Sequence, residues 1–323
     1  MTRSFVRTVA RGVFALALCT TGVWAQGYPE RPVRIIVGFT AGGTTDVVAR
    51  LVAQYLAPLL KQSVVVENKP GAGGVIGSEV VAKAPPDGYT LLMASAGNAT
   101  AAAIYRKLPF DPVKAFAWIG TATAYPFVIS TGSQSRFKSL ADVIAAAKAA
   151  PGRISYGSAG VGVSGHLLGE WLSDAIHIDL LHVPFKGGTG AMIEVMAGRI
   201  DFIIEPIVST LPQVKAGKLR ALAVTSNKPT NFLPGVPAAV ATAPGYEFQS
   251  WLGLAAPAGT PAAIVERLNR ELRRLLADAE VQKRLAEFAG VAAPSSPGAM
   301  RAQVASEIER WRQLVKNRKI PQQ

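Results

Sequence analysis

The chain has 323 residues, 49% hydrophobic and 17% charged, which is enough for two domains with buried cores. Its formal net charge of +13 reflects 34 basic against 21 acidic residues. The sequence has no block of Lys and Arg with interleaved aromatic residues, which argues against a nucleic-acid partner. The diffuse positive charge favours anionic ligands instead.

The first 25 residues have the pattern of a secretory signal peptide. Three arginines precede an apolar run over residues 13–23, which is too short to cross a bilayer. Small residues at Val23 and Ala25 follow, so we expect cleavage after residue 25 and export to the periplasm. Cleavage would remove Cys19, the single cysteine, and with it any disulfide or cysteine–metal chemistry.

Strand and helix patterns alternate along the rest of the chain, which predicts an α/β fold with largely parallel sheets. In chain order, the predicted strands cover residues 33–37, 64–66, 89–94, 124–130, 154–157, 180–184, 200–204, 221–225 and 251–256. The predicted helices cover residues 45–60, 74–83, 139–150, 164–174, 191–197, 209–216, 261–276, 281–288 and 296–316. The remaining segments read as a small polar turn at 95–98, an extended surface segment at 105–117 and a loop at 227–247.

Two glycine clusters between residues 38 and 77 each follow a β-branched run and precede a helix. A chain that turns through glycine into a helix directs free backbone N–H groups toward one point, which favours an anion. One such turn more often reflects turn geometry alone. Two on neighbouring units indicate a pair of loops that grip one small acidic molecule. Comparable junctions at Ser158–His166 and Lys186–Gly188 predict a second lobe that faces the first across a cleft.

Several longer motifs then occur in order along the chain. They are Tyr28-Pro-Glu-Arg-Pro-Val-Arg-Ile-Ile-Val, Gly42-Gly43, Val66-Glu-Asn-Lys-Pro-Gly-Ala-Gly-Gly74, Pro86-Asp-Gly-Tyr-Thr-Leu91, His182-Val-Pro-Phe-Lys-Gly187, Ala216-Gly-Lys-Leu-Arg-Ala-Leu-Ala-Val-Thr225 and Ala256-Pro-Ala-Gly-Thr-Pro261. From Tyr28 onward the chain resembles the Bug family of periplasmic solute-binding proteins, the receptors of tripartite tricarboxylate transporters.

The resemblance implies a type II periplasmic-binding-protein fold, in which two α/β lobes joined by crossover strands close on a ligand in the cleft between them. We expect lobe 1 to comprise residues 26–127 and 249–323, and lobe 2 residues 128–248. The implied partners are a small organic acid and the membrane components of a tripartite tricarboxylate transporter. We expect a monomer without a cofactor or a metal.

Family members grip one carboxylate with two loops of lobe 1, and lobe 2 supplies specificity. The resemblance places the lobe 1 contacts at Phe39, Thr40, Ala41, Gly42, Gly43, Thr44, Thr45, Ala72, Gly73 and Gly74. Ser95 and Asn98, in the small polar turn after the predicted strand at 89–94, are further candidates. It places the lobe 2 contacts at Ser158, Val163, Ser164, His166, Lys186, Gly187 and Glu205.

This chain departs from the family pattern at several of these positions. Ala41 stands where proline is common, Val161 and Val163 replace polar residues, and Glu205-Pro206 replaces Asp-Asn. The departures argue against a highly charged tricarboxylate such as citrate. They favour a monocarboxylate, or a compact dicarboxylate with an apolar body or with an amine or hydroxyl for Glu205.

Most of the polar candidates also have a purely structural explanation. Asp46 lies in the first turn of its helix, where an acid stabilises the dipole. Asn98 suits a side-chain-to-backbone turn, Ser164 suits a helix N-cap, and His166 suits packing. Glu205 is the exception, because a carboxylate in an apolar run needs a partner.

Two alternative functions compete with solute capture. A secreted hydrolase is disfavoured because Gly162-Val-Ser164-Gly-His166 lacks the full Gly-x-Ser-x-Gly pattern, and the histidines lack metal-ligand spacing. We therefore expect no catalysis. A receptor that presents the same acids to a membrane sensor kinase needs the same closing lobes, so the sequence does not separate it from a transport receptor.

Overall fold

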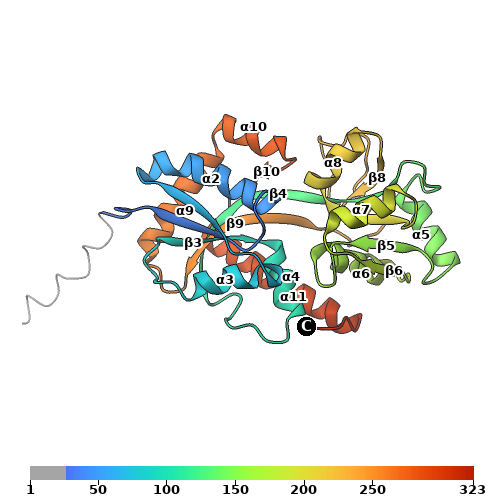
Figure 1. Ribbon diagram of the computed structural model, residues 1–323, viewed down its shortest axis with the longest axis horizontal. Coiled ribbons are helices and arrows are strands. Elements are labelled where there is room, and N and C mark those ends of the chain that lie inside the picture. The colour runs from blue at the N-terminus through green and yellow to red at the C-terminus, as the bar shows by residue number, and fades with distance from the viewer. Residues whose placement is uncertain (1–26) are drawn as a thin grey trace, which may run out of the picture.

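The computed structural model describes residues 27–323, so the predicted signal peptide lies outside the described residues. Two lobes lie side by side and are joined by the long strands β4 (Phe116–Gly132) and β9 (Gln249–Pro257) (Figure 1). Within the described part, no helix combines the length and the apolar character that crossing a membrane requires.

Lobe 1 has a mixed sheet covered by helices. Its strands run in the order β2-β1-β3-β9-β4, with β1 parallel to β2 and β3 and antiparallel pairing from β3 to β9 onward. Its elements are β1 (Val33–Val37), α2 (Thr44–Leu60), β2 (Val64–Asn68), the 3₁₀ turn η1 (Ala72–Gly74), α3 (Val75–Ala82), β3 (Thr90–Ser95), α4 (Ala96–Ile104), α9 (Ala262–Leu276), α10 (Ala279–Glu287), β10 (Val291–Ala292) and α11 (Pro297–Asn317).

Lobe 2 repeats this arrangement around the second half of β4. Strand β4 pairs antiparallel with β7 and β8, and β5 lies parallel to both β6 and β7. Its elements are α5 (Leu140–Ala149), β5 (Ser155–Ser158), α6 (Ser164–Ile176), β6 (Leu181–Pro184), α7 (Gly188–Met196), β7 (Phe202–Pro206), α8 (Ile207–Lys215), β8 (Leu219–Val224) and the 3₁₀ turn η2 (Ala239–Ala241).

The crossover strands pair directly along residues 116–126 and 249–257, and Thr225 bonds to the residue that follows this pairing in β4 and to the one that precedes it before β9. Its backbone N–H and side-chain hydroxyl bond to Phe127 in β4, and its carbonyl accepts from the N–H of Phe248, just before β9. The hydroxyl also bonds to the Phe248 carbonyl at 2.8 Å. Thr225 is fully buried, and the two phenylalanine rings lie edge to face at 5.6 Å. The predicted lobe boundaries adjoin these two phenylalanines, and placing the hinge here remains a prediction.

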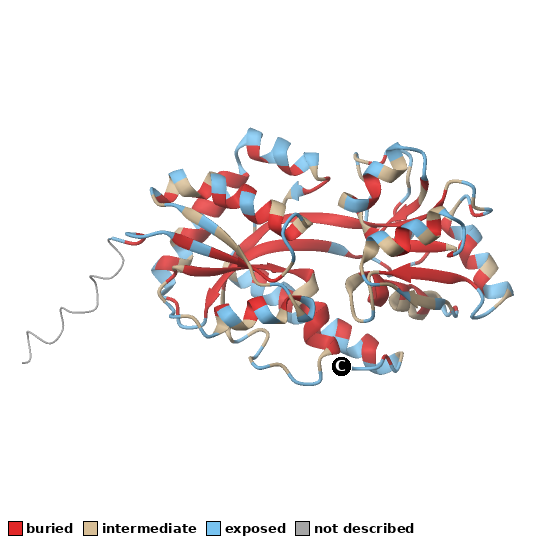
Figure 2. Cartoon of the chain, in the orientation of Figure 1, coloured by how far each residue is buried: buried red, intermediate tan, exposed pale blue. Residues whose placement is uncertain are grey.

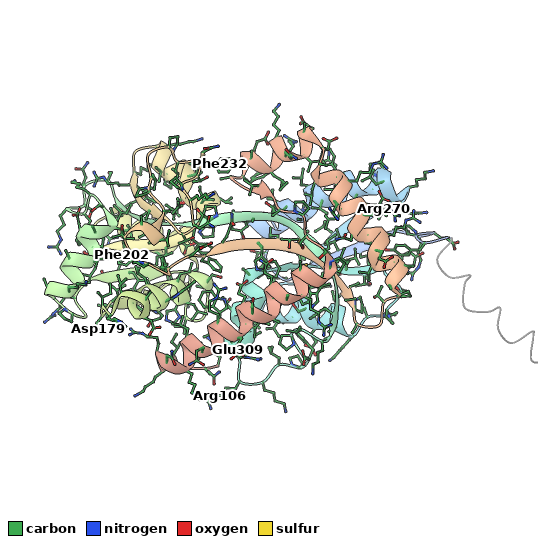
Figure 3. The ribbon with its side chains drawn as sticks, turned by 180° about the vertical axis from the view of Figure 1, so that it is seen from behind. Arg106, Asp179, Phe202, Phe232, Arg270 and Glu309 are labelled. Atoms are coloured by element: carbon green, nitrogen blue, oxygen red, sulfur yellow. The ribbon has the colours of Figure 1, made fainter. Side chains whose placement is uncertain are left out.

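The crossover strands are buried over nearly their whole length, with Gln249 at the start of β9 exposed (Figure 2). Helix α11 covers their back and reaches from lobe 1 to lobe 2, as Figure 3 shows for the helix that carries Glu309. There Arg318 Nε bonds to Glu170 of α6 at 3.1 Å, and Arg310 lies over the Trp171 ring. Helix α11 therefore ties the lobe 2 helix α6 to lobe 1.

The structure confirms most predicted elements and corrects three of them. Residues 96–104 form helix α4 rather than a polar turn, because Ser95 and Asn98 make a capping pair ahead of an alanine-rich run. Strand β4 has 17 residues instead of seven, since it serves both sheets. The two crossover strands pair antiparallel, so only the outer strands of each lobe follow the predicted parallel pattern.

Candidate functional site

A cavity of about 270 Å³ lies in the cleft between the lobes. Lobe 1 lines it with Phe39, Gly73 and one face of α4, and lobe 2 lines it with residues 159 and 161–165 and the end of β7. Five of the predicted contact residues are brought together on this wall: Phe39, Gly73, Val163, Ser164 and Glu205. The other predicted contacts lie around or behind the wall.

Four helix N-termini border the cavity. Gly97 lies in the first turn of α4, Gly165 lies in the first turn of α6, Gly73 precedes α3, and Pro206 caps α8. First-turn N–H groups have no acceptor within their helix, and the helix dipole adds positive potential there. Among the described residues, no side chain that lines the cavity is basic. An anion bound here would therefore meet backbone amides rather than Lys or Arg.

The first glycine loop, residues 40–43, is held from below by a buried carboxylate. Asp46 accepts hydrogen bonds from the N–H of Gly42 (2.9 Å), Arg50 Nε (3.0 Å) and Asn68 Nδ2 (2.9 Å). Burial acts to raise the pKa of Asp46, but these bonds outweigh it and lower the pKa below its usual value. Asp46 is thus an ionised anchor for the loop, and residues 40–45 do not line the cavity.

The second glycine loop packs against the end of β1. Residues 71–74 all have positive φ, a conformation that favours glycine, and Ala72 adopts it at 49°. A side chain on Gly38 would lie within 2.8 Å of the Gly74 Cα atom. Glycine at both positions therefore allows η1 to sit beside Phe39, with Gly73 on the cavity wall and Ala72 and Gly74 off it.

Ser95 and Asn98 hold the start of α4 instead of lining the cavity. Asn98 Oδ1 accepts from the Ser95 N–H (2.8 Å) and from its hydroxyl (3.0 Å). Asn98 Nδ2 donates to Ser78 Oγ at 2.9 Å, and Ser78 in turn bonds to the Gly74 carbonyl. This chain of bonds connects the N-termini of α3 and α4, so both residues position the wall.

The lobe 2 loop is built on two stacked histidines. His166 Nδ1 accepts the N–H of Gly162 at 3.0 Å, and its ring stacks on His182 at 3.9 Å between centroids. Burial lowers the pKa of each histidine to about 4. Both are therefore neutral at physiological pH, and His166 carries its proton on Nε2. The ring fixes the loop from behind and does not line the cavity.

Ser158 lies 2.7 Å from His182 Nε2, a distance that would suit a nucleophile and its base. However, Ser158 is fully buried, its hydroxyl donates to the Gly160 carbonyl at 2.9 Å, and it accepts the Gly160 N–H at 3.2 Å. His182 Nε2 must then donate to the hydroxyl rather than take its proton. The pair closes the loop and offers no exposed nucleophile.

The loop after β6 supports its neighbour without lining the cavity. The N–H of Gly187 donates to the Ala159 carbonyl at 3.2 Å, whereas Lys186 is exposed. Ser164 begins α6 instead of capping it, since Val163 is the N-cap and makes no side-chain bond. Gly165 lets this helix end approach β7, because a side chain there would lie 2.5 Å from the Ile204 carbonyl oxygen.

Glu205 is the one acidic residue on the described cavity wall. It is only 8% exposed, and no hydrogen bond or ion pair within residues 27–323 involves its carboxylate. Burial raises its pKa to about 7. No group of three His, Cys, Asp or Glu residues in the described chain is placed to hold a metal ion.

Sequence reasoning missed the face of α4 and the chain end. Gly97, Thr100, Ala101 and Ile104 lie on one helical face toward the cavity, a spacing that a helix prediction would have exposed. Gln323 also lines the cavity, and its backbone pairs with Ile104 and Arg106. That pairing spans about 220 residues of chain and leaves no local signal.

Residues 48–320 match the family described as the tripartite tricarboxylate transporter family receptor. The chain belongs to this family. Among solved structures, the periplasmic binding protein BugD is 36% identical with a TM-score of 0.78, and the match covers 92% of this chain and 100% of BugD. The predicted resemblance to the Bug family and the predicted fold class are confirmed.

Two further structures similar to this receptor were solved with ligands. A protein of R. palustris, solved with adipate, is 34% identical to this chain with a TM-score of 0.81. The match covers 91% of this chain and 99% of the R. palustris protein. MatC from Rhodopseudomonas palustris, with bound malate, is 31% identical, covers 89% and 100%, and has a TM-score of 0.77. The receptor thus belongs to a family of solute-binding proteins.

Proposed function

We propose that this receptor captures a small carboxylate between its lobes and delivers it to the membrane components of a tripartite tricarboxylate transporter. The main observation in support of this proposal is the cavity, which four helix N-termini from both lobes border. A carboxylate that bonds to amides of both lobes stabilises the closed arrangement over the open one, and that difference is the mechanism of capture. The ligands of the similar proteins, adipate and malate, support this class.

Binding without catalysis fits the polar groups near the cavity. Ser158, His166 and His182 all hold the loop with bonds that use their reactive atoms. The receptor would work in the periplasm after removal of the predicted signal peptide, as a monomer. Transport is preferred over presentation to a sensor kinase because the matching family is described as a transporter receptor.

A ligand screen tests the proposal. The chain from residue 26 onward is mixed with aliphatic, aromatic and amino acids, and with neutral sugars, and thermal unfolding is followed. We expect stabilisation by one or a few carboxylates and none by sugars, since a ligand at 100 times its Kd adds about 2.7 kcal/mol. Stabilisation by a sugar alone, or by no acid, would refute carboxylate capture.

Substitution of Gly73 locates the binding. Gly73 lines the cavity and has a φ of 63°. A Cβ atom added to Gly73 would lie 3.3 Å from the Ala101 methyl group. Gly73→Val should abolish the stabilisation by ligand. Gly217→Val is the matched control, because Gly217 has a φ of 68°, has open space around it and does not line the cavity. Equal loss of binding in both variants would show a strain effect rather than a site.

A further inference from the structure

Glu205 is 8% exposed on the cavity wall, and its carboxylate makes no hydrogen bond or ion pair within residues 27–323 while its oxygens stay open to the cavity. Its side chain lies against Gly188 in the first turn of α7, so close that a Cβ there would be 2.9 Å from the carboxyl carbon. The surrounding side chains on the wall are mainly apolar, from Phe39, Ile104, Phe127 and Val163. A buried carboxylate in such surroundings gains strongly from any hydrogen-bond donor that reaches it.

The same wall limits what the body of a ligand can be. No basic side chain lines the described cavity, so each anionic group of a ligand would depend on backbone amides for its neutralisation. A second carboxylate near Glu205 would place two like charges side by side. Val161 and Val163 on the same wall favour an apolar body.

We propose that the ligand is a monocarboxylate with an apolar body whose other end donates a hydrogen bond, from a hydroxyl or an ammonium, to Glu205. This inference rests on the proposed carboxylate capture and narrows it. The ligand carboxylate meets the helix N-termini, and the donor replaces the missing partner of Glu205. The raised pKa of Glu205 supports the assignment, because a donor would stabilise the ionised form that burial disfavours.

Four six-carbon acids that differ only at one end test the donor. They are hexanoate, 6-hydroxyhexanoate, 6-aminohexanoate and adipate, and benzoate with 3- and 4-hydroxybenzoate forms a rigid second series. Affinities are measured by calorimetry at pH 8 for the wild type and Glu205→Gln, with Glu247→Gln as an exposed control outside the cavity. Gly188→Ala is a second variant, which displaces the Glu205 carboxylate without changing its charge.

We expect the donor-bearing acids to bind the wild type about ten- to hundredfold more tightly than their parent acids. In Glu205→Gln the ammonium acid should lose that advantage and adipate should gain several-fold, whereas Glu247→Gln should match the wild type. Gly188→Ala should weaken the donor-bearing acids selectively.

Two results would contradict the inference in different ways. Binding of these acids without a preference for the donor, or with a preference that Glu205→Gln leaves unchanged, overturns the assignment of Glu205 and leaves carboxylate capture standing. Failure of every acid in both series to bind, together with a negative acid screen, overturns carboxylate capture and this inference with it.

Discussion

Replacing Glu205 by Gln should change how the stability of the ligand-free receptor depends on pH. Burial raises the pKa of Glu205 from 4.5 to about 7, so the folded protein holds this proton more tightly than the unfolded chain. The contribution of this protonated carboxyl to the free energy of unfolding is fully present below pH 4.5 and is lost as the pH rises through 7. Each pH unit between the two pKa values changes the free energy of unfolding by about 1.4 kcal/mol, so the loss between pH 5 and 8.5 is on the order of 2–3 kcal/mol.

Urea unfolding of both proteins at pH 5 and at pH 8.5 measures this effect. Burial also raises the pKa of Glu307 to about 7. Glu307 and the two histidines titrate in both proteins, so their contributions cancel in the difference between variant and wild type. That difference should shift by about 2–3 kcal/mol in favour of Glu205→Gln as the pH rises. A difference that stays constant from pH 5 to 8.5 would refute the reasoning that Glu205 is buried and unpaired.

Two other contacts near the site give further predictions. His166→Ala should cost about 2 kcal/mol or more and weaken ligand binding, because the Gly162 N–H loses its acceptor; unchanged affinity would show that the loop holds its shape without the ring. Arg318→Met should cost about 1–2 kcal/mol, since its partner Glu170 is only 14% exposed. A double-mutant cycle with Glu170→Gln checks the pair, and strictly additive costs would contradict a coupling across the lobes.

The sequence was sufficient to predict the alternation of strands and helices and a cleft between two α/β lobes. The glycine loops were found because turns at positive φ need glycine, which is a local requirement. Their role was harder to predict, because residues 40–45 surround the cavity without lining it. The lining face of α4 was hidden by the interpretation of Ser95–Asn98 as a turn, although the alanine-rich run that follows favours a helix.

Other parts of the site depend on contacts between distant segments. The stacking of His166 on His182 joins two loops of lobe 2, and neither residue carries a sign of it in its own neighbourhood. Gln323 reaches the cavity only because α11 lies beside α4. Glu205 was identified correctly as a buried carboxylate, since an acid within an apolar strand is unusual enough to stand out.

The bonds of Thr225 to both crossover strands have a mechanical consequence. Phe127 and Phe248 are tied to the same buried residue, so the strands resist sliding past one another at this point. We therefore predict that relative motion of the lobes is a rotation about Thr225 rather than a shear. Amide hydrogen exchange at these two phenylalanines should be slow whether or not a ligand is bound, whereas exchange at the first turns of α4 and α6 should slow only on binding. The pivot and the site would thus be distinguished by which amides respond to the ligand.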